Sequence, residues 1–510
     1  MQWLTKIADS LEATYPTGDI LVSSGVSPSG RYHVGTLREV LTADAVLIIL
    51  KKRGRTVKHI HFVDDLDGLR KVPAGVPEDF SRYLGKPVCD IPSPEPGSDS
   101  YANYYLNDFI GNVDTLGIEM EAVRSHEKYR AGFFVPSIEK ALANIAELRA
   151  CLEEVSGRQL TDEWSPIQVN IDGYLKKRPF KAIDTSKKEV TYVGIDDTEE
   201  TISYANGDVK LDWRVDWPAR WWQLGVHAEP FGRDHATKGG SYDTGKAIVE
   251  RVFGGFAPIP VPYQFINRSG ETKKMSKSAG NTVTISELLE VLPPEIIRYF
   301  ILRSSPEKQL FFSQTDGLVR LIDEYAELLA KPDKTPDDEM LLFVCTSTLK
   351  QNTISNIPFS HLVASYQAAL RDSKKTIEII ARTEHADIAS EQASTIEKEL
   401  AYIDRWLDTW ADEDVKFKLL DDISDVTLDE HQHKFLELLS EKISKAPQDA
   451  DGTWFHTAIY ELKDELEMAP KSMFSTLYQV LIGQESGPRA GWFLSILPRD
   501  WLIARLKLKA

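Results

Sequence analysis

Two stretches that lie far apart in the chain carry side chains suited to holding phosphate groups. The first reads S-S-G-V-S-P-S-G-R-Y-H-V-G-T-L-R-E from Ser23 to Glu39, and the second reads K-K-M-S-K-S-A-G-N from Lys273 to Asn281. His33 can donate a hydrogen bond to an anion, and the lysines around Ser276 can neutralise charge that develops at an α-phosphate. Either stretch alone is commonly a capped turn or a solvated loop, but the two together predict that the chain binds a nucleoside triphosphate.

Regular elements on either side of the first stretch would place His33 at the start of a helix. The apolar run Asp19-Ile20-Leu21-Val22 predicts a buried strand, and Leu41 to Leu50 predicts a helix. A helix N-terminus offers free backbone N–H groups and a positive dipole end, which favour a phosphate. Gly35 has no side chain, so a flat ring could lie against the backbone there. Val57 to Val63 predicts a second strand, which completes a β-α-β unit of a parallel sheet.

A group of aspartates follows directly after the second predicted strand. The run reads Asp64-Asp65-Leu66-Asp67. Because ligands of open α/β sheets bind at the carboxyl ends of the strands, a carboxylate here is well placed to meet a cationic substrate group. The same aspartates could instead cap the next helix or pair with Arg70 and Lys71. The sequence leaves both interpretations open.

The second half of the predicted sheet carries a tryptophan cluster and a glycine-rich loop. The cluster reads L-D-W-R-V-D-W-P-A-R-W-W from Leu211 to Trp222. Such a cluster favours a core or a stiff interface, although one ring could line a pocket beneath a cationic group. The loop reads F-G-R-D-H-A-T-K-G-G-S-Y-D from Phe231 to Asp243. Asp234 in this loop is a natural acceptor for ribose hydroxyls, with a helix N-cap as the alternative.

The composition indicates a chain with several cores and no membrane span. The sequence has 510 residues, of which 42% are hydrophobic, and no apolar run is long enough to cross a bilayer. Its first residues alternate charged and apolar side chains, unlike a signal peptide. Its 3 cysteines are too far apart for a C-x-x-C metal site and cannot all pair within one chain, which fits a reducing compartment. We therefore expect a cytoplasmic protein that does not bind membranes.

The formal net charge of −18 argues against a non-specific DNA binder. Net charge reports on solubility and non-specific binding, whereas a folded nucleic acid can be held by local patches and by shape. Three short basic patches are present, at Lys51-Lys52-Arg53, Lys176-Lys177-Arg178 and Lys187-Lys188. Each alone is more typical of a solvated face. We expect no DNA partner.

The phosphate motifs belong to a wider set of stretches that covers nearly the whole chain. They read S-G-V-S-P-S-G-R-Y-H-V-G-T-L-R-E at Ser24, H-F-V-D-D-L-D-G-L-R-K-V-P at His61, W-R-V-D-W-P-A-R-W at Trp213, G-R-D-H-A-T-K-G-G-S-Y-D-T-G at Gly232, K-M-S-K-S at Lys274, L-P-P-E-I-I-R-Y-F at Leu292 and G-P-R-A-G-W-F at Gly487. The set resembles the class I lysyl-tRNA synthetases, the type found mainly in archaea and some bacteria. The two phosphate motifs specify only class I, whereas W-R-V-D-W-P-A-R-W and G-G-S-Y-D-T-G are much more selective.

The resemblance implies an α/β fold with a Rossmann-type parallel-sheet catalytic domain split by an insertion, followed by an all-α C-terminal anticodon-binding domain. The expected domains are residues 1–90 (first half of the catalytic domain), 91–210 (connective insertion), 211–282 (second half with the K-M-S-K-S loop), 283–335 (stem-contact region) and 336–510 (helical anticodon-binding domain). The pattern agrees independently, because residues 169–208 read as strands and residues 339–510 read as helices almost throughout. Residues 101–116 and 135–156 are predicted to be helical stretches.

The resemblance also implies the reaction, its cofactors and its partners. L-lysine attacks the α-phosphate of ATP, with Mg²⁺ present, to give lysyl-adenylate and diphosphate. The lysyl group then passes to the terminal adenosine of tRNA(Lys). Enzymes of this subgroup generally need bound tRNA before they activate the amino acid, and we expect this chain to act as a monomer.

Site residues follow from the resemblance by position. It implies catalytic roles for His33, Lys274 and Lys277. It implies ATP binding by His33, Gly35, Gly232, Asp234, Lys274, Met275, Ser276, Lys277 and Ser278, and lysine binding by Gly25, Ser27, Glu39, Trp217, His235 and Tyr242. Chemistry supports the lysine pocket independently, because an ε-ammonium needs an acceptor-only carboxylate and Glu39 lies about two turns into the helix that begins at His33.

Two features depart from many relatives of this family. Ser27 stands where many of them have threonine, so the hydroxyl is kept and a methyl group is lost. Many relatives also carry cysteine pairs in the insertion that bind zinc. The corresponding region from Glu163 to Thr201 contains no cysteine, so we expect no structural zinc.

Three kinds of rival fit part of the pattern, namely another class I synthetase, a small-molecule nucleotidyltransferase and a non-catalytic paralogue. A glutamyl enzyme would need a pocket arginine, so Glu39 argues against it, whereas an arginyl enzyme is harder to exclude by charge. A small-molecule nucleotidyltransferase would share the phosphate motifs but would have little use for the long helical C-terminal region. A non-catalytic paralogue would not need His33, Lys274, Lys277 and Asp234, all of which are present.

Overall fold

The computed structural model describes residues 1–270, 282–413, 415–420, 422–423, 426–448 and 450–509. The chain divides into two compact units, each built from several segments. The first unit contains Met1–Leu289, Ile297–Phe312 and Pro336–Lys350, and the second contains Glu290–Ile296, Ser313–Thr335 and Gln351–Ala510.

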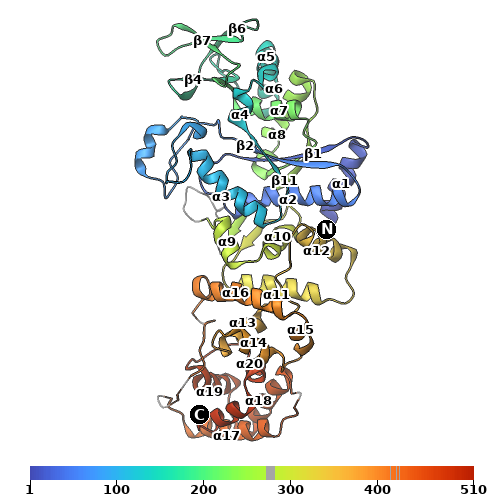
Figure 1. Cartoon of the computed structure of the whole chain (residues 1–510), viewed down its shortest axis with the longest axis vertical. Coiled ribbons are helices and arrows are strands. Elements are labelled where there is room, and N and C mark those ends of the chain that lie inside the picture. Colours follow the sequence, from blue (N-terminus) through green and yellow to red (C-terminus); the bar gives the residue numbers. More distant parts are fainter. Residues whose placement is uncertain (271–281, 414, 421, 424–425, 449, 510) are drawn as a thin grey trace. The chain divides into compact units, whose positions relative to one another are not determined.

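A five-stranded parallel sheet forms the centre of the first unit (Figure 1). Its strand order is β11-β10-β1-β2-β3, and every pairing is parallel. The bounds are Ile20–Val26 for β1, Val57–Val63 for β2, Glu121–Arg124 for β3, Ala228–Gly232 for β10 and Ile259–Tyr263 for β11. The predicted Rossmann-type sheet is confirmed. β2 has its predicted bounds because its apolar run ends sharply at the aspartates, whereas β1 continues past its apolar run to Val26, since every residue of it pairs with β2.

The helix that follows β1 is buried on nearly every side. This helix, α2 (Val34–Lys52), begins well before the apolar run at Leu41 that predicted it, and each residue from Thr36 to Leu50 is buried. It packs against β1, β2 and β10 and also contacts α1 (Gln2–Thr14) and α12 (Pro336–Thr346). Figure 1 shows α1 and α2 alongside the strands. A helix that is buried almost all round is typical of a core element.

Two buried arginines fasten α2 to the rest of the first unit. Arg38 on α2 donates four hydrogen bonds of 2.8–3.0 Å to backbone carbonyls between residues 301 and 308. Arg298, on α10 (Pro294–Leu302), lies 2.6 Å from Asp44 on α2 and also donates to two backbone carbonyls. Both guanidinium groups are almost fully buried. These hydrogen bonds therefore fix the position of α2, whose first turns carry the end of the first phosphate motif.

The segment in which the connective insertion is expected contains helices and two small antiparallel sheets. The sheets have strand orders β5-β4-β9 and β6-β7-β8. Their strands are β4 (Ile167–Ile171), β5 (Tyr174–Lys177), β6 (Phe180–Asp184), β7 (Glu189–Val193), β8 (Glu199–Ser203) and β9 (Val209–Leu211), so the predicted stranded segment is confirmed. The helical stretch predicted for residues 135–156 is confirmed, with one break at Asn144. The chain forms α5 (Val135–Ala143) and α6 (Ile145–Ser156), because Asn144 leaves the helical conformation and bonds its side chain to the Lys140 carbonyl.

The remaining elements of the first unit surround the sheet or follow it. They are α3 (Tyr101–Thr115), α4 (Ser125–Arg130), α7 (Trp213–Leu224), α8 (Ser241–Ile248), a pair of short parallel strands β12 (Ile266–Arg268) and β13 (Leu310–Phe312), and α9 (Ile285–Val291). The break between α9 and α10 falls at Pro293 and Pro294, since a proline cannot continue a helix.

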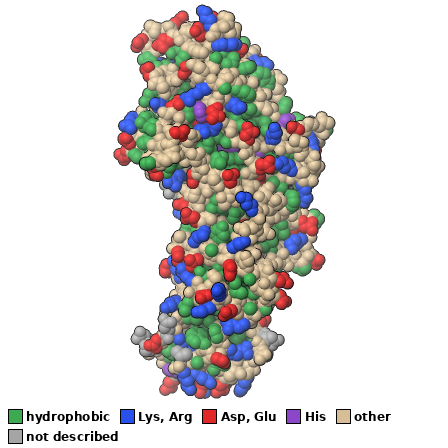
Figure 2. Space-filling view, viewed as in Figure 1, with side chains coloured by type: hydrophobic (Ala, Val, Ile, Leu, Met, Phe, Trp, Pro, Cys, Tyr) green, Lys and Arg blue, Asp and Glu red, His purple; other side chains and the backbone are tan. Residues whose placement is uncertain are grey.

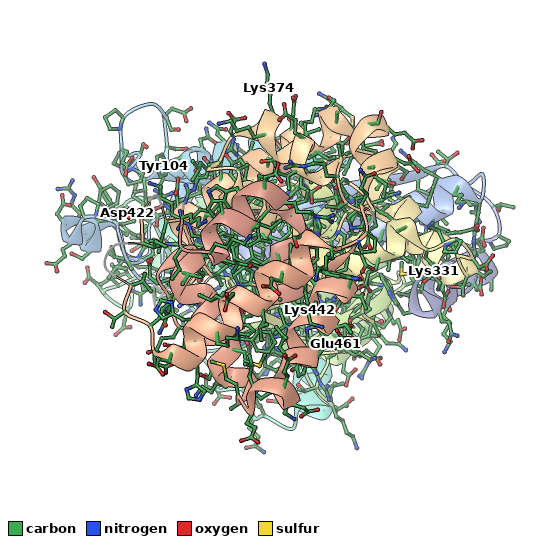
Figure 3. The ribbon with its side chains drawn as sticks, turned by 90° about the horizontal axis from the view of Figure 1, so that it is seen from below. Tyr104, Lys331, Lys374, Asp422, Lys442 and Glu461 are labelled. Carbon is green, nitrogen blue, oxygen red and sulfur yellow. The ribbon has the colours of Figure 1, made fainter. Side chains whose placement is uncertain are left out.

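Helices are the only regular elements among the described residues of the second unit apart from turns and loops, and no strand occurs there. Its helices are α11 (Asp316–Ala330), α13 (Phe359–Ala368), α14 (Ser373–Ile380), α15 (Ala386–Glu391), α16 (Ala393–Thr409), α17 (Glu430–Ser444), α18 (Gly452–Leu466), α19 (Pro470–Ile482), α20 (Ala490–Ile496) and α21 (Arg499–Leu506). An ion pair of 2.7 Å between Lys442 and Glu461 joins α17 to α18 (Figure 3). The predicted all-α character of the C-terminal region is confirmed.

The surface carries charges of both signs. Figure 2 shows acidic and basic side chains interspersed over the face in view. Among the helices that the structure describes, none has the length and apolar character needed to cross a membrane.

Candidate active site

A cavity of about 690 Å³ opens at the carboxyl ends of β1, β2 and β10. Its walls come from those strand ends, from α2 and from α7. This is the edge at which parallel α/β sheets bind their ligands, because the loops that leave the strands diverge there. Charged and aromatic side chains line it together, which is typical of a site for a polar organic molecule.

A buried carboxylate, Glu39, faces this cavity. Its Oε1 accepts a 2.6 Å hydrogen bond from the Gly25 backbone N–H, and its Oε2 accepts one of 2.7 Å from the Tyr263 hydroxyl. Burial raises the pKa of Glu39 to about 8, although both hydrogen bonds lower it. Within the described ranges, no lysine, arginine or histidine forms an ion pair with this carboxylate. Such an acceptor suits a cation that a ligand supplies.

Asp64 and Asp67 also line the cavity, but each is paired with a buried cation. Arg220 contacts Asp64, and the Lys210 ammonium lies 3.0 Å from Asp67. Both cations also contact Asp216 on α7. Burial lowers the pKa of Lys210, but the charges of Asp216 and Asp67 outweigh burial and raise it. These aspartates therefore belong to a buried charge network that reaches the cavity wall.

Asp65 serves the fold and does not line the cavity. Its carboxylate accepts hydrogen bonds from the side chains of Arg124 (2.5 Å) and His126 (2.7 Å). Burial opposes its charge, but the hydrogen bond from His126 and the charge of Arg124 outweigh burial and lower the pKa of Asp65. Of the pairings that the sequence suggested, Arg70 lies 3.8 Å from Asp67. The structure thus separates three aspartates that the sequence could not tell apart.

One wall of the cavity is aromatic. Trp217 on α7 lines it and stacks on Trp213, with ring centroids 5.6 Å apart. His235 approaches Trp217 at 5.7 Å, and Phe231 meets it edge to face at 5.4 Å. The tryptophan cluster therefore serves both predicted roles, since Trp217 and Trp221 are buried in the core and both of them, with the partly buried Trp213, also line the pocket.

His33 is the N-cap of α2. Its Nδ1 accepts a 3.0 Å hydrogen bond from the Gly35 N–H, so the neutral ring carries its proton on Nε2. A Cβ on Gly35 would lie 2.6 Å from the His33 ring. The imidazole of His33 thus lies directly against Gly35, and only a residue without a side chain leaves room for it.

The rim of the cavity is formed by the chain that leaves β10. Gly232 ends the strand, and a short 3₁₀ turn, Arg233–His235, carries Asp234 into the rim. A Cβ on Gly232 would lie 2.6 Å from Oδ1 of Asp234, so glycine leaves room for the carboxylate over the strand end. The Asp234 side chain is 53% exposed and presents acceptor oxygens to the cavity, as a ribose would require.

The structure gathers seven of the expected site residues around one cavity. These are Gly25, Ser27, Glu39, Trp217, Gly232, Asp234 and His235. His33 and Gly35 lie at the start of α2, outside the cavity lining. Tyr242 does not line the cavity either, because it stacks behind Phe231 and donates its hydroxyl to the Pro258 carbonyl. The expected phosphate residues Lys274, Met275, Ser276, Lys277 and Ser278 lie outside the described residues.

Two residues of the cavity lining do not belong to any of the sequence motifs described above. Tyr263 is the last residue of β11, and Glu229 is the second residue of β10. A charged residue inside the apolar strand A-E-P-F-G is the signal that could have identified Glu229. Tyr263 could have been found from its position at the carboxyl end of a predicted strand.

Comparison with known proteins places this chain in a family. Residues 1–343 match the family model described as tRNA synthetases class I (K). The chain is 36% identical to lysine–tRNA ligase 1 of Methanosarcina acetivorans over 99% of its own length and 98% of that protein. It is 32% identical to the lysine–tRNA ligase of Archaeoglobus fulgidus, with 95% and 96% covered. A glutamate tRNA ligase from Elizabethkingia meningosepticum is a distant structural neighbour, 12% identical with a TM-score of 0.40 over 96% of this chain and 98% of that one. The full-length sequence matches agree with the motifs, and the chain belongs to the class I tRNA synthetases of type K.

Proposed function

We propose that this chain is a lysine–tRNA ligase. It joins L-lysine to ATP to give lysyl-adenylate and diphosphate, and it then transfers the lysyl group to the 3′ end of tRNA(Lys) and releases AMP. The observation that carries the proposal is the buried carboxylate of Glu39, which the Gly25 N–H and the Tyr263 hydroxyl orient and which no described basic side chain neutralises. An ε-ammonium supplies the missing charge and three donors.

The unpaired carboxyl groups of the cavity favour a cationic amino acid over an acidic one. Glu39 and Glu229 both line it, and neither forms an ion pair with a described basic side chain, so a glutamate side chain would meet their acceptor oxygens. The relatives that are 36% and 32% identical are named as lysine–tRNA ligases, which favours lysine over arginine.

The adenylation step requires charge to be neutralised at the α-phosphate. A carboxylate oxygen of lysine attacks the phosphorus, the bond to diphosphate breaks, and charge develops on the phosphate oxygens. We assign a hydrogen bond from Nε2 of His33 to these oxygens, since Nδ1 is occupied by the Gly35 N–H. Lys274 and Lys277 are assigned the same task by the family motif, and Asp234 is assigned to the ribose hydroxyls.

Mg²⁺ accompanies ATP in this proposal. Across the described ranges, no group of three His, Cys, Asp or Glu side chains could hold a metal ion. The ligands of the ion would therefore come chiefly from the triphosphate and water, as is common for Mg²⁺ in nucleotide enzymes.

We assign anticodon binding to the helical C-terminal region. The second unit contains a cavity of about 840 Å³ whose lining includes Trp492, Arg320 and Arg489. His361, also in the lining, lies edge to face with Trp492 at 5.6 Å and with His385 at 4.9 Å. Aromatic rings stack on unpaired bases and arginines bind phosphates, so these side chains support the assignment.

The remaining assignments follow the family resemblance. The insertion at 91–210 meets the acceptor end of the tRNA, and residues 283–335 contact the acceptor stem. The enzyme works as a monomer in the cytoplasm.

Charging of total tRNA with each of the twenty amino acids tests the proposal. We expect attachment of lysine alone by the wild-type chain, a large loss of activity in His33→Ala, and normal activity in His431→Ala, which alters an exposed histidine of α17. Attachment of arginine or glutamate would refute the pocket assignment at Glu39. A wild-type chain that charges no amino acid would refute the proposed activity.

A further inference from the structure

Glu229 is a second buried carboxylate in the wall of the cavity. The indole N–H of Trp217 lies 3.2 Å from each of its oxygens, and the indole N–H of Trp221 lies 2.5 Å from Oε2. Glu229 comes from β10, whereas both tryptophans come from α7. One side chain of the sheet therefore holds two rings of the neighbouring helix.

A carboxylate is an unexpected choice for a merely structural link. Burial raises the pKa of Glu229 to about 7, while the two indoles and the charge of Arg220 lower it. No described lysine, arginine or histidine forms an ion pair with Glu229, unlike Asp64, which Arg220 contacts. Burying an unpaired charge costs free energy that an apolar residue would not, and such departures from packing rules concentrate at functional sites.

A carboxylate can nevertheless do what no other side chain of this size can. It is an acceptor-only group with about four lone-pair positions, so it can receive two indole N–H groups at once. Glutamine has the same shape, but its amide N–H₂ would face one of the indoles as a second donor. A negative charge at the indole N–H also makes the wall formed by Trp217 more attractive to a cation.

We propose that Glu229 is a positioning residue of the amino-acid pocket, which fixes Trp217 in the cavity wall and makes that wall favour a substrate with a cationic side chain. The inference rests on the proposed function, because the cationic substrate is lysine. Glu39 meets the ε-ammonium directly in that proposal, whereas Glu229 acts through Trp217.

The test compares Glu229→Gln with wild type in the full chain, with ATP, Mg²⁺ and tRNA present. We expect the KM for lysine to rise about 10- to 100-fold, as for the loss of a hydrogen bond to a charged group, while the KM for ATP and kcat change little. Norleucine, which has nearly the same shape as lysine but no ε-ammonium, serves as a competitive inhibitor. The inhibition constant of norleucine should be nearly the same in Glu229→Gln as in wild type. The preference of the enzyme for lysine over norleucine should therefore be smaller in the variant.

A matched control and a second variant keep the result interpretable. Glu121→Gln neutralises an exposed carboxylate on β3 of the same sheet and should leave both constants unchanged. Trp217→Phe keeps a ring but removes the N–H, so it should also raise the KM for lysine, and the double variant should lose less than the sum of the two changes. If Glu229→Gln does not fold, the KM for lysine of Trp217→Phe alone tests the inference.

Two outcomes would overturn the inference. One is an unchanged KM for lysine in folded Glu229→Gln or in Trp217→Phe. The other is an equal weakening of lysine and norleucine, which would mean that Glu229 only supports packing. A wild-type chain that does not charge lysine would refute the proposed function instead, and this is read from the wild-type reaction alone.

Discussion

The Tyr263 hydroxyl donates a 2.7 Å hydrogen bond to Oε2 of Glu39, between residues 224 positions apart in the chain. Tyr263 ends β11 at one edge of the sheet, and Glu39 lies in the helix after β1. The hydroxyl therefore orients an acceptor that the strand at Gly25 holds from the other side. Two elements that lie far apart in the sequence therefore hold Glu39 in position to bind a cation.

Removal of that hydroxyl should weaken lysine binding selectively. In Tyr263→Phe, Glu39 keeps only the Gly25 N–H, and we expect the KM for lysine to rise by roughly tenfold with the KM for ATP unchanged. Steady-state charging assays measure both constants. Tyr460→Phe, at an exposed tyrosine of α18, is the control and should behave as wild type. Equal increases in both KM values would contradict the assignment.

The titration of Glu39 should make the stability of the ligand-free protein depend on pH. Burial raises the pKa of Glu39 in the folded chain to about 8, from an ordinary value of 4.5. The folded state thus binds more protons than the unfolded state between these values. The contribution of Glu39 to the free energy of unfolding is on the order of a few kcal/mol. It is fully present below about pH 4.5 and is lost as the pH rises through about 8.

Thermal unfolding of wild type and Glu39→Gln across this pH range measures that contribution. Relative to the variant, the wild-type Tm should fall as the pH rises toward 8. Lysine should offset the fall, because its ammonium stabilises the ionised carboxylate, and binding near neutral pH should release a proton that calorimetry in different buffers detects. Parallel Tm profiles for the two proteins would contradict the raised pKa.

Alanine at Gly35 should displace the ring of His33. The added Cβ would lie 2.6 Å from that ring, so the imidazole must move away from the start of α2. We expect Gly35→Ala to lower kcat by about 10²-fold or more, within the range for loss of one oriented donor to a developing charge. ATP–diphosphate exchange with tRNA present measures this step. Gly111→Ala on α3 adds a Cβ with no atom within 4 Å and should leave the rate unchanged, and a fully active Gly35→Ala would refute the role of His33.

The buried pair of Arg298 and Asp44 should be essential for stability. Arg298→Leu leaves the carboxylate buried without its partner, and we expect a loss of about 3–5 kcal/mol. Lys51→Ala breaks an exposed pair with Glu119 at the end of the same helix and should cost less than about 1 kcal/mol. Chemical denaturation of the full chain compares them. The double variant Arg298→Met, Asp44→Leu should recover much of the loss, and failure to do so would show that the charge is not the cause.

Much of the sheet could be predicted because its signals are local. The apolar run Val57–Val63 stops at a cluster of aspartates, and a break of this kind marks a strand end in any context. The interruption at Asn144 could not be predicted, because the apolar period continues through it and the break depends on one side-chain hydrogen bond.

Residues of the site could be predicted from the sequence only where they belong to a recognisable motif. Glu39 and Asp234 belong to such motifs, and both line the cavity. Asp64 and Asp65 have the same chemistry and adjacent positions, but successive side chains of an extended chain point to opposite sides, so only tertiary structure assigns one to the cavity. Glu229 could not be assigned because its partners come from another element.

The burial of α2 also limits how substrate preference can change. Because every position from Thr36 to Leu50 is packed by neighbours, a substitution there disturbs the core as well as the pocket. Residues such as Ser27, which leave the sheet edge and are only partly buried, can vary at lower cost. Laboratory evolution toward lysine analogues should therefore accumulate changes in the strand-end loops and leave this helix nearly invariant.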